Sequence, residues 1–215
     1  MFHQLQFRVG IKAAWPQYLV VLLFLISALL HFQIDVSDTR WTGFGDAWDY
    51  LKQSELPLFS WDFFFPENQN WSERPFTVPL LYKLCGKDVD TIFVVQKIIH
   101  FFAGCLLTLA IMAFLKTKFA KAICGVLLCL LLGWWNVLSW TNLISSESVS
   151  LSMMLLWLAS FLFWIKSPSK VKLAIHFLLL ILFSFTRDNW PYFLLIFYGL
   201  SLILLFYQKS LWKSI

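Results

Sequence analysis

The chain has 215 residues, of which 60% are hydrophobic and only 13% are charged, and its formal net charge is +5. A soluble globular domain carries about 25% charged residues, so this composition excludes an ordinary soluble protein and indicates a membrane protein. The lysines flank hydrophobic segments and do not form an exposed patch with base-stacking aromatics, so the positive charge does not indicate a nucleic-acid partner.

Six long apolar runs follow one another along the chain. A helix that crosses a bilayer needs ~20 mainly apolar residues, and the fifth run, the shortest, must include flanking residues to reach that length. The six predicted spans are Ala14–Phe32, Thr91–Leu115, Ala122–Trp140, Ser148–Ile165, Leu173–Thr186 and Pro191–Tyr207. The sequence therefore predicts an all-α polytopic membrane protein, a single transmembrane domain over residues 1–215 with a long, partly helical first outer loop at about 33–90.

Lysine and arginine set the expected orientation. They precede the first span, fill the turns after the second and fourth spans, and recur in the C-terminal tail. Loops rich in these residues stay in the cytoplasm, which places the N-terminus inside and the loop 33–90 outside. All twelve carboxylates then fall on the outer face, ten of them in that loop. Such a collection of acids predicts a polar site there.

The first outer loop contains a short helical pattern that begins after Gly45. Asp46, Asp49 and Tyr50 are three and four residues apart, so they share one face of the predicted helix. Asp46 is well placed as an N-cap. Two interpretations stay open: a plain cap beside a solvated acid, or a carboxylate held at a reaction centre.

A second helical pattern follows Arg74-Pro75 and ends at Cys85-Gly86. Arg74 lies at the start of this helix, next to the positive end of its dipole, where a cation is not stabilised. We therefore expect an anion nearby. It is either a carboxylate of the protein (Glu73, Asp46 or Asp49) or a ligand.

Charged residues also lie at the mouths of later spans. Glu147 opens the fourth span, where it is either a helix-capping acid or part of a site. Arg187 and Asp188 lie in the outer turn before the sixth span, and Arg187 either binds a phosphate or forms a surface pair with Asp188 or Glu147. Lys97, near the start of the second span, is expected to reach the same face. No metal-ligand spacing occurs, so no cofactor is predicted, and a divalent metal at the outer acids stays open.

The order of these motifs resembles a known family. Asp46–Tyr50 in a large outer loop, Arg74-Pro75 with Pro79, Gln96 in the second span, Ser146-Glu147-Ser148 and Thr186-Arg187 occur in the order found in the N-terminal half of GT-C class membrane glycosyltransferases. The nearest resemblance is to the dolichyl-phosphate-mannose-protein mannosyltransferase and aminoarabinose transferase family. It covers about residues 15 to 200.

The resemblance implies transfer of a sugar from a polyprenyl-phosphate-linked donor at the outer face of a bacterial inner membrane. The partners it implies are this donor and the surrounding membrane lipid. The catalytic role falls on Asp46, with Asp49 as the alternative. The substrate-binding residues it implies are Tyr50, Arg74, Lys97, Glu147, Arg187 and Asp188. Family members continue for hundreds of residues, so we expect an N-terminal fragment, a short relative, or one half of a two-chain enzyme whose partner membrane chain supplies the missing half.

Two rival functions remain. The chain is alternatively a non-catalytic membrane subunit or degenerate paralogue, whose outer loop binds a lipid-linked glycan or a partner protein. A carrier is less favoured, because transporters place polar residues in broken helices at mid-membrane, whereas the centres of these spans are nearly free of charge. The variant Asp46→Asn distinguishes the enzyme from the subunit. Loss of sugar transfer with intact expression supports the enzyme, and unchanged function supports the subunit.

Overall fold

The computed structural model describes residues 2–33, 46–64 and 74–187, together with positions 191, 192, 194, 195, 198 and 199. Every regular element in these ranges is a helix, which confirms the all-α prediction. The helices are α1 (Phe2–Gln33), α2 (Asp46–Glu55), α3 (Trp61–Phe64), α4 (Thr77–Leu84), α5 (Val89–Met112), α6 (Lys118–Leu132), α7 (Trp135–Ser139), the 3-10 helix η2 (Trp140–Asn142), α8 (Ser146–Lys166) and α9 (Lys170–Ser184).

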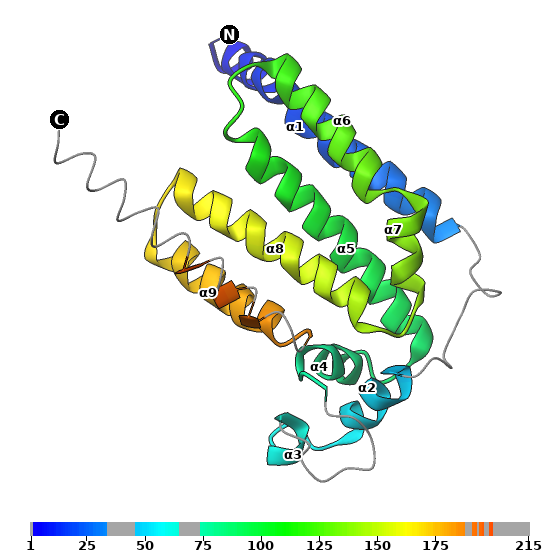
Figure 1. The fold of residues 1–215 in the computed structure, drawn as a ribbon. Coiled ribbons are helices and arrows are strands. Elements are labelled where there is room, and N and C mark those ends of the chain that lie inside the picture. The colour runs from blue at the N-terminus through cyan, green and yellow to red at the C-terminus, as the bar shows by residue number, and fades with distance from the viewer. Residues whose placement is uncertain are drawn as a thin grey trace, which may run out of the picture.

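The long helices lie side by side, and the short ones gather at one end (Figure 1). α5 packs against α8, α8 against α9, and α1 against both α6 and α5. Val20 and Phe24 of α1 join Leu107, Leu132 and Leu155 in the main apolar core. α2 and α4 pack on each other beside the starts of α5 and α8, so the residues of the outer loop reach the same end as the start of α8.

Within the described residues, three helices are long and apolar enough to cross a membrane: Ala14–Phe32 within α1, then α5 and α8. A fourth span exists if Lys118–Leu132 and Asn136–Asn142 count as one, although they meet at a bend of 48°. These helices correspond to the first four predicted spans. α9 has 15 residues, about 22 Å of helix against the ~30 Å hydrocarbon core, and the sixth predicted span lies mostly outside the described residues.

The outward faces of the long helices are apolar. Leu22 and Leu29 on α1 and Leu130 on α6 are more than half exposed. Only 22% of the apolar window of α1 is buried inside the molecule. Extended exposed apolar surfaces are what lipid-facing helices present, so the described fold is compatible with an integral membrane protein.

Local chemistry sets several helix ends. Asp88 caps α5 by accepting hydrogen bonds from the Thr91 backbone N–H at 2.9 Å and from the Thr91 hydroxyl at 2.6 Å. Gly86 follows α4 at a φ of +67°, a conformation that favours glycine, and it stops this helix as the sequence predicts. α2 begins after Gly45, as predicted, but Asp46 is its first helical residue and not the residue before it, where an N-cap stands.

Candidate functional site

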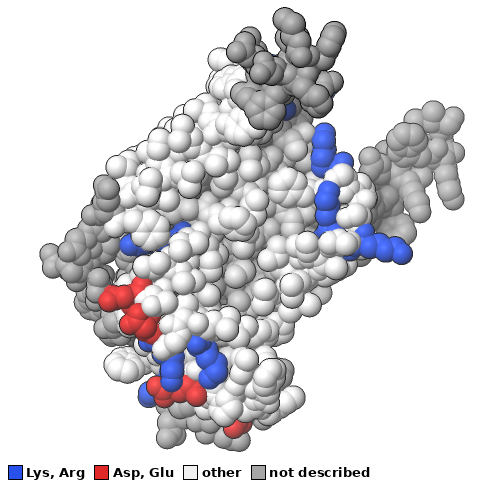
Figure 2. Space-filling view, turned by 180° about the vertical axis from the view of Figure 1, so that it is seen from behind, with Lys and Arg blue, Asp and Glu red and all other residues white. Residues whose placement is uncertain are grey.

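Charge divides between the two ends of the bundle. Figure 2 shows acidic side chains gathered with basic ones at one end, whereas only Lys and Arg are visible at the other. The acids described at the first end come from α2, α3, the start of α5 and the start of α8, namely Asp49, Glu55, Asp62, Asp88, Asp90 and Glu147. The predicted segregation of acids therefore holds for these residues.

Helix α4 joins the segments that carry the candidate residues. At its start, Thr77 donates its backbone N–H to the Phe185 carbonyl at 3.1 Å and its hydroxyl to the Leu182 carbonyl at 2.8 Å. The rings of Phe76 and Phe185 lie 4.9 Å apart. These contacts fix the end of α9 against α4, and Arg187 follows two residues after Phe185.

Tyr82 makes the connection from α4 to α8. Its side chain is fully buried, and its hydroxyl donates to the Ser145 carbonyl at 3.0 Å. Its ring meets the Tyr50 ring edge to face at 6.4 Å. Burial first, and then the neighbouring Tyr50, raise the pKa of the Tyr82 phenol far above its usual range. Tyr82 is therefore a permanent donor that holds α2, α4 and the start of α8 together.

The first ion pair of the site joins α2 to the segment before α4. Arg74 Nη2 lies 3.2 Å from Asp49 Oδ2, and the two side chains are only 16% and 15% exposed. The guanidinium also lies over the Tyr50 ring, 5.6 Å from its centroid. Of the anions expected for Arg74, the structure thus provides Asp49. The partly buried pair costs desolvation, so its main effect is to fix geometry.

Two further polar side chains hold this region in place, and sequence reasoning missed both. Gln53 is fully buried, and its amide nitrogen donates to the Phe63 carbonyl at 2.9 Å and to the Arg74 carbonyl at 2.8 Å. Lys83 Nζ donates to the Ser54 carbonyl at 3.0 Å. A single glutamine or lysine in an amphipathic helix carries no pattern that would have singled it out.

The second ion pair joins the start of α8 to the turn after α9. Arg187 Nη1 lies 3.4 Å from Glu147 Oε1, with the side chains 42% and 29% exposed. This pair is more open than the Arg74–Asp49 pair. The Tyr50–Tyr82 contact and the bond from Tyr82 to Ser145 link the two pairs. Residues more than 100 positions apart therefore form one polar region at one end of the bundle.

The remaining candidates are placed differently. Asp46 is the first residue of α2, three residues before Asp49, and its side chain lies outside the described part. Asp188 also lies outside the described residues. Lys97 is on α5, is buried with 7% of its surface exposed, and sits 5.6 Å from the centroid of the Phe32 ring at the end of α1. Lys97 thus packs beside the end of α1 and is buried there.

In the described ranges, no group of three or more His, Cys, Asp and Glu side chains is arranged to hold a metal ion. Searches of family models, of curated proteins and of solved structures found no match to this chain. The residues of the site are therefore the evidence for its chemistry.

Proposed function

We propose that this chain is a glycosyltransferase of the GT-C type, which moves a sugar from a polyprenyl-phosphate donor to an acceptor at the outer membrane face. The observation that carries the proposal is the convergence of Asp49, Arg74, Glu147 and Arg187, with Tyr50, at one end of a bundle of apolar helices. A donor with a lipid tail and a charged, hydroxyl-rich head needs such a junction of polar groups and hydrocarbon.

The two aspartates of α2 take different roles in this proposal. Asp49 is engaged by Arg74, so it positions that arginine. Asp46 lies one helical turn earlier and on the same face. Asp46 would act as the general base that accepts the proton of the acceptor hydroxyl as the new C–O bond forms. The bond from the sugar carbon to the phosphate oxygen breaks, and the polyprenyl phosphate leaves with the electron pair.

Arg187 is the better candidate to stabilise the leaving phosphate. It contacts Glu147 through Nη1 and keeps 42% of its side chain exposed, so its fork retains surface for a second anion. A donor positioned on a leaving oxyanion is worth about 10²–10³ in kcat. Orientation with this end outside, and residence in a bacterial inner membrane, belong to the same proposal.

The test is release of polyprenyl phosphate by the purified chain, in detergent or liposomes, from a panel of polyprenyl-phosphate sugars. Asp46→Asn should lower release by about 10²–10⁴, the usual contribution of a general base. Asp62→Asn is the matched control, because it removes the same charge from the exposed face of α3, and it should leave release unchanged. Equal release by the wild type and by Asp46→Asn would contradict the role of Asp46 as the general base.

The rival function is a non-catalytic subunit, and one observation favours it: both arginines already face carboxylates of the chain itself. A structural network would look the same. If the folded chain releases nothing from any donor, yet retains a lipid-linked glycan or a partner membrane chain on a column, the subunit interpretation replaces the enzyme.

A further inference from the structure

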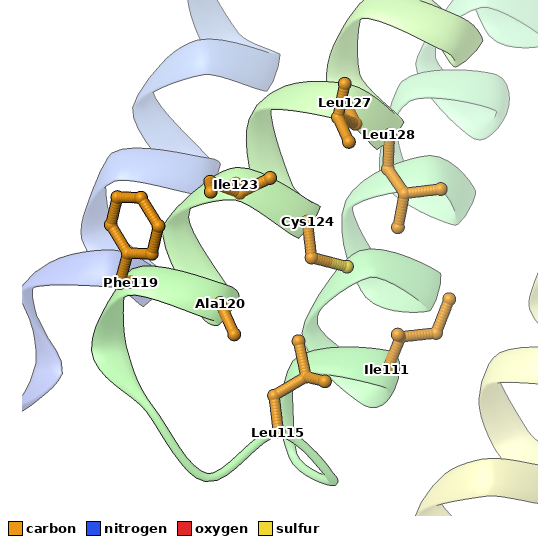
Figure 3. A pocket seen from close by; sticks show the side chains of 8 residues that line it. All are labelled: Ile111, Leu115, Phe119, Ala120, Ile123, Cys124, Leu127 and Leu128. Carbon is orange, nitrogen blue, oxygen red and sulfur yellow. The ribbon is translucent and has the colours of Figure 1, made fainter.

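A second candidate site lies at the opposite end of the bundle, between the end of α5 and the start of α6. It is an open apolar groove of about 610 Å³, within the ~300–1,000 Å³ of small-molecule sites. Its lining residues are Ile111, Leu115, Phe119, Ala120, Ile123, Cys124, Leu127 and Leu128. Figure 3 shows side chains of α6 pointing across the groove toward Ile111 and Leu115. In a bilayer such a groove accepts hydrocarbon.

Cations border one end of this groove. Lys116 and Lys118 lie between two lining residues, Leu115 and Phe119, and both lysines are exposed. Lys121 follows in the first turn of α6, where the helix carries no acid. No Asp or Glu occurs anywhere from residue 91 to residue 146. The mouth of the groove is therefore strongly positive.

A fourth lysine reaches the same turn from α8. Lys166 Nζ lies 5.4 Å from the centroid of the Phe114 ring, which stands two residues before Lys116 in the α5–α6 turn. Two neighbouring helices thus contribute cations to one place. The positive end of the α6 dipole adds to the same field, and long lysine stems can follow the apolar wall while their ammonium groups reach the headgroup level.

We propose that this groove binds an anionic phospholipid, with one acyl chain along the apolar wall and the headgroup phosphate at Lys116, Lys118 and Lys121. Charge complementarity selects this occupant. A zwitterionic lipid would fill the groove equally well but would gain little from the lysines, because its headgroup carries no net charge. The site is independent of the proposed sugar transfer, since it lies at the other end of the helices.

The experiment uses the full chain in phosphatidylcholine nanodiscs doped with a phosphatidylglycerol analogue that carries a photoreactive diazirine in its acyl chain. Crosslinks mapped by mass spectrometry should fall within Ile111–Leu128. The substitutions Lys118→Gln and Lys121→Gln, made together, should lower labelling at equal lipid concentration by about twenty-five-fold, since each lysine near an anionic surface strengthens binding about fivefold.

Two controls make the result decisive. Lys170→Gln with Lys172→Gln removes the same charge from the first turn of α9, and it should leave groove labelling unchanged. Ala120→Phe fills the groove without altering charge, and it should lower labelling although every lysine remains. Equal labelling by a phosphatidylcholine analogue, or an equal loss in the Lys170/Lys172 variant, would overturn the proposal.

Discussion

Replacing Tyr82 by Phe tests the contact that assembles the candidate site. The substitution keeps the buried ring against Tyr50 and removes only the hydroxyl that donates to the Ser145 carbonyl at 3.0 Å. A buried hydrogen bond of this kind stabilises the folded state by about 1 kcal/mol net. Ser145 is the N-cap of α8, so this bond ties Tyr82 of α4 directly to the start of α8.

The expected readout is local. About 1 kcal/mol corresponds to a roughly fivefold larger equilibrium constant for separating α4 from α8, so protected amides of Thr77–Leu84 should exchange with deuterium about fivefold faster. Tyr82→Ala removes the ring as well, at a cost of about 3–5 kcal/mol for a large aromatic, and exchange should accelerate more than a hundredfold. Hydrogen-exchange mass spectrometry in detergent micelles measures both changes.

Tyr192→Phe is the control for this experiment. It removes the same hydroxyl from a side chain that is 71% exposed, and it should leave exchange in α4 unchanged. Unaltered exchange in Tyr82→Phe, or an equal acceleration in Tyr192→Phe, would show that the bond to Ser145 does not hold α4 on α8. The link between the two ion pairs through Tyr82 would then be refuted as well.

Two other features make sharp predictions. A methyl group at Gly125 would overlap the Cγ2 of Val20 on α1, so Gly125→Ala should destabilise the α1–α6 contact by about 1–3 kcal/mol, seen as a lower thermal midpoint in detergent. Adding Val20→Ala should recover most of this loss, and a neutral single variant would refute the close approach. At the start of α5, hydrogen bonds from Thr91 lower the pKa of the Asp88 carboxyl. The folded pKa is then below the unfolded one, so this cap stabilises the helix above the ordinary value of 3.8 and is lost as pH falls through the folded value. Exchange at the start of α5, corrected for the intrinsic pH effect, should rise on acidification in the wild type and not in Asp88→Asn.

The sequence predicted the long helices because their signal is local. A run of apolar residues such as α5 needs no partner to be recognised, and Gly86 ends α4 for a reason carried by one residue. The fifth predicted span corresponds to α9, whose 15 helical residues are too few to cross the hydrocarbon core alone. The bend after α6 was not predicted. It falls at Gly133, within what reads as one continuous apolar run.

The site was predictable in composition and not in pairing. The sequence offered Glu73, Asp46 and Asp49 as partners of Arg74, and the packing of α2 on α4 brings Asp49 to it. The sequence pattern does not single out Tyr82, because this residue lies within a stripe of leucines, where a tyrosine resembles any other apolar residue. Its role depends on Ser145, which is 63 residues away.

Exposure separates the two arginines more clearly than their sequence context does. The Arg74 pair is shielded and its cation also covers the Tyr50 ring, so a phosphate could approach only by breaking that arrangement. Arg187 contacts Glu147 through one nitrogen at 3.4 Å and remains 42% exposed. A guanidinium has five N–H donors, and the Glu147 contact, the one seen among the described residues, engages one nitrogen of the group. Under the proposed function, Glu147 therefore orients Arg187 toward the incoming phosphate. The Asp49–Arg74 pair fixes the geometry of α2 against the segment before α4.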